Sequence, residues 1–274
     1  MPRFRDLKTF KDFQRALKNK YGIGEGESYK PWLRVQDVPS RGSSAKIQGI
    51  KIDREHHTLS EGESAYFYLA EYRDSVIDIR EQFPLLPIDL SIKIASYLGV
   101  VHPTIPDSKA LNVMTTDFVL TCFDKKKGTW YEAVSVKSKE EDLANKRTAE
   151  KLEIERIWWQ LLDIPFRVYV NTPESQSKSK NIQWFTAPLR HGEVFPDSLI
   201  FAACDLLHVG PMITDQVCSE FSLKFDIDGA QALSLLKTLF AKKIVDVNLD
   251  NPMPESGVFE VINISQARAK QHAG

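Results

Sequence analysis

Three polar side chains in the first half of the sequence are spaced so that they could do chemistry together. Glu63 stands in the first turn of an expected amphipathic helix, Asp117 lies in Met-Thr-Thr-Asp-Phe-Val-Leu, and Lys137 ends Glu-Ala-Val-Ser-Val-Lys. Two carboxylates can hold a divalent cation that activates water, and a lysine beside them can stabilise charge on a phosphate. The set predicts metal-dependent hydrolysis of a phosphodiester bond in DNA.

Each of these residues also has a plainer interpretation. Ser60-x-x-Glu63 is a capping box, and helix capping alone would account for a glutamate at that position. Lys137 could be no more than a charge that protects an edge strand. Asp117 is harder to explain in this way, because aspartate is unfavourable inside a strand.

Alternation along the strand that ends at Lys137 limits which acids can meet the lysine. Successive strand residues point to opposite faces, so Ser135 and Lys137 share one face and Glu132 lies on the other. A second acid near Lys137 must therefore come from another element. Glu63 is the candidate.

The elements that must position these residues form an α/β pattern. In chain order they are a helix from Ser60, strands over 75–84, 115–123 and 130–138, a helix over 143–162 and a strand over 166–170. A basic helix is expected before them, over residues 1–20.

The last hundred residues predict a second domain. A polar joint at 171–180 precedes three amphipathic helices and two strands, the order of a winged helix. We therefore expect a catalytic domain with a basic N-terminal arm at 1–170 and a winged-helix domain at 171–274.

Charge is distributed unevenly between the two ends of the chain. Residues 1–54 carry 13 Lys and Arg against 6 Asp and Glu, whereas residues 192–274 carry 6 against 11. The front of the molecule should attract DNA, and protein docking is favoured over DNA binding for the acidic C-terminal domain. The alternative for the basic arm is a solvated segment without a ligand. The residues expected to contact DNA phosphate are Lys8, Lys11, Arg15, Lys18 and Lys20. His56 and His57 are further candidates for such a contact, but a packed or solvated role is favoured for these two adjacent histidines.

Composition narrows the class of protein. The 42% hydrophobic and 27% charged content is that of a globular protein, and no apolar run approaches the ~20 residues of a membrane span. The three cysteines are an odd number and are not arranged in Cys-x-x-Cys pairs. A reduced, cytoplasmic protein without a structural zinc site fits this pattern best.

Several motifs across residues 28–168 occur together in the order and spacing of one known family. They are Tyr-Lys-Pro-Trp-Leu at 29–33, Arg-Glu-His-His at 54–57 with Leu-Ser-Glu-Gly-Glu at 59–63, Asp-Ile-Arg-Glu-Gln-Phe-Pro-Leu at 78–85, Met-Thr-Thr-Asp-Phe at 114–118, Val-Lys at 136–137 and Glu-Lys-Leu-Glu-Ile-Glu-Arg at 150–156. In these motifs the chain resembles the TnsA-type endonuclease subunit of heteromeric transposases.

This resemblance implies a restriction-endonuclease-like fold with Glu63, Asp117 and Lys137 as catalytic residues. Mg²⁺, for which Mn²⁺ would substitute, would be held by the two acids and the backbone carbonyl of Val136. The family often has Gln, Glu or Asp where this chain has Ser135, which would contact the metal directly or through water.

The resemblance also implies partners and a place for the protein in the bacterial cytoplasm. A TnsA-like subunit cuts the 5′ ends of the element, and a TnsB-like transposase of the DDE type cuts and joins the 3′ ends. A TnsC-like ATPase of the AAA+ type would contact the C-terminal domain. Two alternatives remain open: a stand-alone restriction or repair nuclease, and a non-catalytic DNA-binding regulator.

Overall fold

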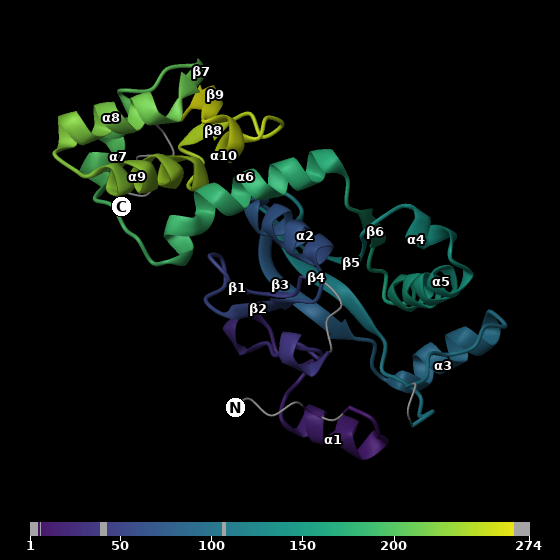
Figure 1. Ribbon diagram of the computed structural model, residues 1–274. Helices are drawn as coiled ribbons and strands as arrows, with labels where there is room; N and C mark the ends of the chain where they lie inside the picture. The colour runs from purple at the N-terminus through teal and green to yellow at the C-terminus, as the bar shows by residue number, and fades with distance from the viewer. Residues whose placement is uncertain (1–4, 6, 39–42, 106–107, 266–274) are drawn as a thin grey trace. The chain divides into compact units, whose positions relative to one another are not determined.

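The computed structural model describes residues 5, 7–38, 43–105 and 108–265 (Figure 1). The chain forms two compact units, residues 1–172 and 173–274. Each unit has its own sheet, and they are described separately.

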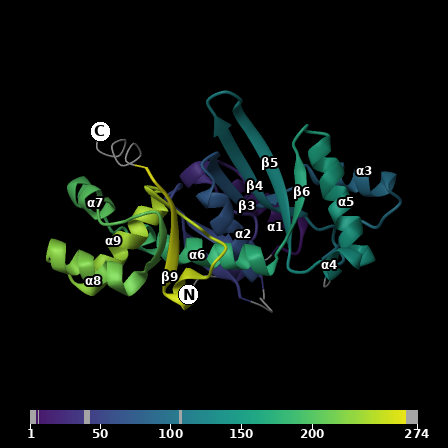
Figure 2. The ribbon, with the colours of Figure 1, turned by 90° about the horizontal axis from the view of Figure 1, so that it is seen from above.

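The N-terminal unit is built on a four-stranded sheet of β3 (Val76–Pro84), β4 (Thr115–Asp124), β5 (Gly128–Lys137) and β6 (Phe166–Val170). Strands β3, β4 and β5 pair with one another in antiparallel fashion, and β6 pairs parallel to β5. Figure 2 shows β4 and β5 projecting together as a hairpin. The expected strands are all present, and the sheet is mixed.

Helices cover both faces of this sheet. On one face α2 (Glu61–Tyr72) places the ring of Tyr66 5.3 Å from that of Phe118. On the other face α3 (Ile88–Tyr97) and α5 (Lys146–Gln160) share a buried cluster with Val119 and Ala133. The α/β prediction of a mixed sheet flanked by helices is confirmed for this unit.

Several elements differ from the sequence prediction. Helix α1 covers only Phe10–Lys18, because Thr9 and Asp12 close a capping box that starts the helix there. Residues 1–4 and 6 of the expected basic helix lie outside the described residues. The expected helix over 143–162 is divided into the short α4 (Glu141–Ala144) and α5, which starts where the Asn145 side chain accepts from the N–H of Thr148.

Helix α3 and four smaller elements were not predicted. The smaller ones are two 3₁₀ turns, η1 (Gly26–Ser28) and η2 (Val35–Asp37), and two short strands, β1 (Ala45–Gln48) and β2 (Glu55–Thr58). The two strands pair as an antiparallel hairpin. Four residues are too few for alternation to stand out in a turn-rich segment.

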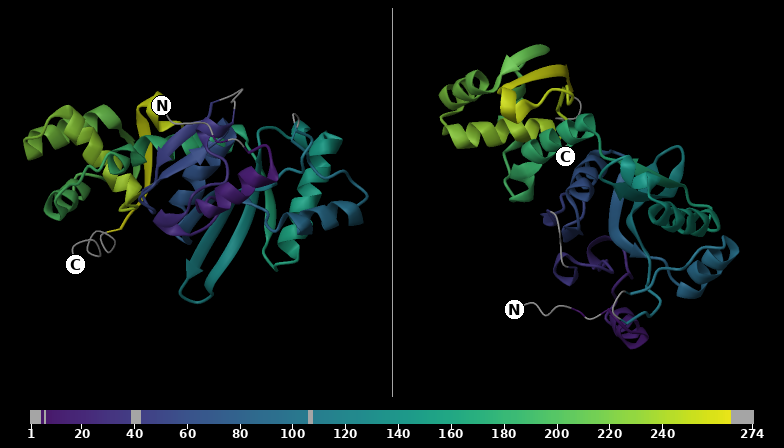
Figure 3. Two further views of the ribbon diagram at one scale, coloured as in Figure 1. Left: turned by 90° about the horizontal axis from the view of Figure 1, so that it is seen from below. Right: turned by 45° about the vertical axis from the view of Figure 1, so that its right-hand side comes forward.

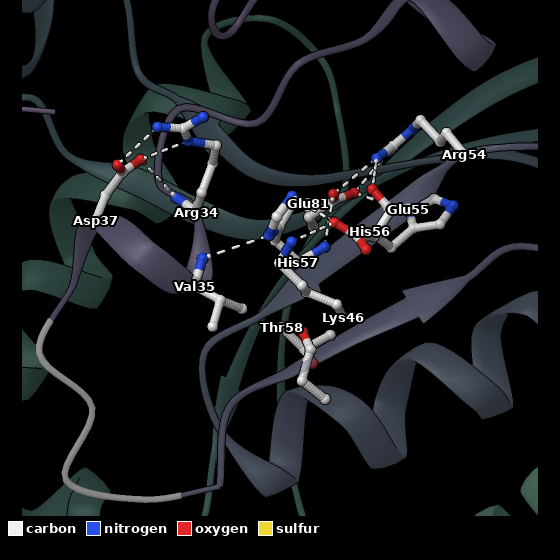
Figure 4. Close-up of polar contacts among 11 residues, drawn as sticks. Arg34, Val35, Asp37, Lys46, Arg54, Glu55, His56, His57, Thr58 and Glu81 are labelled. Carbon is white, nitrogen blue, oxygen red and sulfur yellow. Dashed lines mark hydrogen bonds and ion pairs between the residues drawn. The ribbon is translucent and has the colours of Figure 1, made fainter. Parts of the chain in front are cut away.

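A buried ion cluster attaches the β1–β2 hairpin to strand β3 (Figure 4). The carboxylate of Glu81 is inaccessible to solvent and accepts two hydrogen bonds from the Arg54 guanidinium, at 2.7 and 2.6 Å. It also lies 2.9 Å from Nδ1 of His56 and accepts from the backbone N–H of His57 at 3.0 Å. Burial alone would raise the pKa of Glu81, but Arg54 and His56 hold this pKa at about 2.

The C-terminal unit packs helices on a three-stranded antiparallel sheet in the order β7-β9-β8. Figure 3 shows the yellow strand β9 beside the green helices of this unit. Its elements are α6 (Pro173–Arg190), α7 (Asp197–Cys204), β7 (Gly210–Ile213), α8 (Thr214–Phe225), α9 (Gly229–Ala241), β8 (Val245–Val247), α10 (Met253–Ser256) and β9 (Val258–Ile264). The ring of Phe240 on α9 lies 6.2 Å from Phe185 and 5.0 Å from Phe259, which ties α6 and β9 to one core.

The prediction of a polar joint at 171–180 was wrong, because most of this segment belongs to helix α6. The polar first half of α6 hid the helix, but its Asn181 is fully buried and donates to the carbonyls of Leu249 and Asn251. Strand β7 also adds a third strand to the two that were expected. Across the described residues, no helix is long and apolar enough to cross a membrane.

The structure predicts that two ion pairs made by the β1–β2 hairpin segment contribute very differently to the free energy of unfolding. Glu81→Ala leaves Arg54 buried without its partner, so the free energy of unfolding should fall by about 3–5 kcal/mol. Glu55→Ala removes the partner of Lys46, a pair in which both side chains are close to half exposed, and should cost less than about 1 kcal/mol. Urea denaturation followed by circular dichroism measures both. Equal losses would contradict the structural role given to Glu81.

Candidate active site

Asp117 is held in place by the strand beside it. The register of β4 on β5 pairs Phe118 with Val134, which brings Asp117 next to the end of β5. Its Oδ2 atom accepts from the backbone N–H of Val136 at 2.6 Å and from the Ser135 hydroxyl at 3.2 Å. Burial raises the pKa of Asp117, although Lys137 and the N–H of Val136 act in the opposite direction.

Lys137 meets the same group of atoms from the last position of β5. Its Nζ donates to the Ser135 hydroxyl at 3.1 Å and to the Val136 carbonyl at 2.9 Å. Ser135 therefore connects the lysine to Asp117 through one hydroxyl. Glu132 has no part in this arrangement. It lies on the other face of the strand, as alternation predicts, and accepts two hydrogen bonds of 3.0 Å from Arg73.

Glu63 both stabilises its own helix terminus and faces the site. The Ser60 hydroxyl caps the N–H of Glu63 at 3.2 Å. The Glu63 carboxylate accepts from the Ser60 hydroxyl at 3.0 Å and from the N–H of Leu59 at 2.9 Å. Burial and the nearby charge of Asp117 raise the pKa of Glu63 to about 7.

Gln82 links the two acids and was missed from the sequence. Its Nε2 donates to Glu63 Oε2 at 3.1 Å and lies 3.4 Å from Asp117 Oδ1. Its backbone has φ +49° inside strand β3, a left-handed conformation that is costly for a residue with a side chain and is found most often at functional sites. Glutamine within Glu-Gln-Phe-Pro gives little warning of this conformation.

Glu155 is a further buried acid that was not selected as a candidate. It projects from α5, and its Oε2 accepts from the Thr116 hydroxyl at 3.1 Å, which in turn accepts from Trp159 Nε1 at 2.8 Å. Burial, followed by repulsion from Asp117, raises the pKa of Glu155 to about 8. In the sequence it was one of several glutamates in an amphipathic helix.

The structure thus connects the four predicted residues: Gln82 links Glu63 to Asp117, and Ser135 links Asp117 to Lys137. The residues expected to contact DNA are divided. Lys8, Lys11, Arg15, Lys18 and Lys20 are exposed on α1 and beside it. His56 and His57 are only 1% and 7% exposed and belong to the Glu81 cluster, which agrees with the packed role that was favoured over a contact with phosphate.

The oxygen atoms at this site are of the types that bind a hard divalent cation. The site offers two carboxylates that share the amide of Gln82, and the carbonyl oxygen of Val136, whose N–H donates to Asp117. Oxygen atoms of these types are the ligands that Mg²⁺ prefers. Among the described residues, no group of three or more His, Cys, Asp or Glu side chains is arranged to hold a metal ion. A cation here would therefore depend on the two acids, backbone oxygen and water.

Comparison with known proteins finds relatives of this chain. Residues 73–171 match the family described as TnsA-like endonuclease N terminal, a range that contains Gln82, Asp117, Lys137 and Glu155. The Tn7 transposition protein TnsA of Escherichia coli is 34% identical over 264 residues, which cover 93% of this chain and 93% of that protein.

The raised pKa of Glu155 predicts how stability depends on pH in metal-free buffer. The folded protein keeps this proton up to about pH 8, whereas the unfolded chain releases it near 4.5. The stabilising contribution is therefore full below pH 4.5 and is lost as pH rises to about 8, by at most about 1.4 kcal/mol per pH unit.

Glu155→Gln removes this titration, so its free energy of unfolding should fall less than that of the wild type between pH 6 and 8. Urea denaturation at the two pH values, with EDTA present, measures the difference. Parallel losses in both proteins would show that Glu155 is not protonated in the folded state.

Proposed function

This chain belongs to the TnsA-like endonuclease family, and we propose that it cuts DNA at the 5′ ends of a transposable element with Glu63, Asp117 and Lys137. The observation that supports this assignment most strongly is the amide of Gln82, which lies between the two carboxylates. Two acids and a lysine from three different elements would have no structural reason to converge there.

We further propose that the N-terminal unit has the restriction-endonuclease-like fold and that the C-terminal unit is a winged-helix domain. The first proposal is supported by the mixed sheet between α2 and the α3–α5 layer. The second is supported by the order α7, β7, α8, α9, β8 and β9 with its three-stranded antiparallel sheet.

In the proposed mechanism Glu63, Asp117 and the Val136 carbonyl would hold Mg²⁺, or Mn²⁺ in its place, with Ser135 contributing directly or through water. The bound cation would lower the pKa of water and neutralise charge on the phosphate. Lys137 orients the attacking water or stabilises the developing charge, and Ser135 fixes the position of its ammonium group. The N–H of Val136 fixes one oxygen of Asp117, so this carboxylate is held in place before substrate arrives.

The DNA would be drawn to the N-terminal unit by its positive charge. The exposed lysines and arginine of α1 and the residues beside it would neutralise phosphates, and binding should weaken as salt rises. Because its substrate is DNA, we place this activity in the bacterial cytoplasm.

We propose that the C-terminal unit docks protein partners, with a TnsC-like AAA+ ATPase as its contact and a TnsB-like DDE transposase completing excision. Its sequence is acidic over residues 192–274, which disfavours DNA. It also has a cavity of about 730 Å³ between α6, α8 and α9, with Trp184 and Leu233 among its lining residues. At its rim Leu223 is 88% exposed, so an apolar side chain borders the cavity and would be covered by a partner bound there.

The catalytic assignment predicts that single substitutions remove cleavage but not folding. Asp117→Asn and Lys137→Ala should each lower the rate of DNA cleavage at least about 100-fold, because each removes a group that stabilises the transition state. Asp124→Asn, an exposed substitution at the far end of the same strand, should leave the rate unchanged.

The assay uses transposon-end DNA with Mg²⁺ or Mn²⁺, with and without the transposase and ATPase partners. Cleavage only with the partners supports the transposition role, and equal cleavage without them favours a stand-alone nuclease. DNA binding that is indifferent to Asp117, with no cleavage in any mixture, would instead identify a regulator.

The docking proposal predicts that Leu223→Glu weakens capture of the ATPase partner at least about tenfold, since it puts a charge into an apolar contact. Val194→Glu, at a similarly exposed apolar residue outside this cavity, should have little effect. Biolayer interferometry with immobilised partner measures both. Equal binding by the two variants would place the contact elsewhere.

A further inference from the structure

A cavity of about 580 Å³ lies next to the carboxylates of the N-terminal unit and has no part in the mechanism above. Two of its lining residues, Thr115 and Glu155, contact the site directly. The Thr115 hydroxyl donates to Gln82 Oε1 at 3.1 Å, and Glu155 accepts from the hydroxyl of the next residue, Thr116. The cavity therefore adjoins the site: the Thr115 side chain lies between the cavity and Gln82, and Glu155 contacts the residue before Asp117.

The walls of this cavity are apolar and its edge is cationic. The apolar lining comes from the buried cluster under α1 and from the strand that enters the site, and includes Trp32, Leu33, Ile105, Val113 and Met114. The cationic side chains are Arg5, Lys8 and Lys151. Arg5 is bonded to Asp37 and to the carbonyl of Trp32, so it shapes the wall more than it offers a free charge.

Lys151 is the cation best placed to bind an anion near the reacting phosphate. It precedes Glu155 by four residues on α5, so the two side chains lie on the same face of the helix, one turn apart. Lys151 is exposed, whereas Glu155 is buried. An anion at Lys151 would thus lie at the mouth of the cavity, beside the site.

The size and chemistry of this cavity fit one nucleotide. Cavities that hold small ligands have volumes of roughly 300–1,000 Å³ and combine apolar walls with a few polar groups. A base would find apolar surface inside, and the phosphate attached to it would meet Lys151 at the edge. A paired base inside a duplex could not enter, because its partner strand would have to follow.

We propose that this cavity binds an unpaired nucleotide of the strand being cut, next to the scissile phosphate, with its base inside and its phosphate at Lys151. That the bound nucleotide belongs to the DNA strand being cut rests on the proposed function, because the cavity adjoins the proposed cleavage site. Opening the duplex at the cut would then be part of substrate recognition.

Methyl NMR of the full-length protein tests this inference without any cleavage. The chain has four methionines, and Met114 lines the cavity whereas Met212 and Met253 belong to the C-terminal unit. With ¹³C-methyl methionine and EDTA, a 5′-phosphorylated single-stranded tetrathymidylate should shift the Met114 resonance saturably and leave Met212 and Met253 in place. Met114→Leu assigns the resonance.

Two controls make the result specific. Lys151→Ala should raise the dissociation constant about tenfold, because it removes a charge-assisted contact with phosphate. Lys146→Ala, an exposed lysine on the same helix that does not line the cavity, should change it less than about twofold. A blunt, hairpin-closed duplex that is long enough to stay paired should shift Met114 far less than the single strand.

An unmoved Met114 resonance, or equal effects of the two lysine variants, would overturn the proposal. Thymidine 5′-monophosphate that binds as tightly as the oligonucleotide would show a site for free nucleotides instead. Since the metal is absent throughout, these outcomes are separate from the cleavage assay. If the protein cuts no DNA but its Met114 resonance shifts with the oligonucleotide, the proposed function is refuted and the cavity remains a nucleotide site.

Discussion

The close approach of two carboxylates, the buried Glu63 and the partly buried Asp117, is the constraint on which the N-terminal unit depends. Burial raises the pKa of both groups, and the charge of Asp117 raises the pKa of Glu63 further. The fold compensates with donors: the amide of Gln82 lies between the acids, and the N–H of Val136 and the Ser135 hydroxyl serve Asp117. A divalent cation would satisfy both acids more fully than these donors do, so the arrangement is stable without the ion and prepared to accept it.

The surrounding elements hold this arrangement through rigid contacts. Gln82 can reach both acids because its backbone leaves the regular strand conformation, and the residue before it, Glu81, is fixed by the buried ion cluster. The cluster therefore does more than attach the β1–β2 hairpin. It also restrains strand β3 at Glu81, one residue before Gln82. Helix α2 presents Glu63 from its first turn, which Ser60 caps.

Much of this could be predicted from the sequence because it follows from local periodicity. Alternation separated Glu132 from Lys137, and the Ser60 cap located the start of α2; both agree with the structure. What could not be predicted depends on contacts distant in sequence. The positive φ of Gln82 and the burial of Glu155 arise only when β3, β4 and α5 pack together, and the polar first half of α6 concealed a helix that is stabilised by the core of the C-terminal unit.

The most direct test of the central claim is an anomalous difference map from crystals soaked in Mn²⁺. The account predicts a peak bound by the carboxylates of Glu63 and Asp117 and the carbonyl of Val136, with the amide of Gln82 displaced from between the acids. An absent peak, or one bound elsewhere while Gln82 still bridges the two carboxylates, would contradict it.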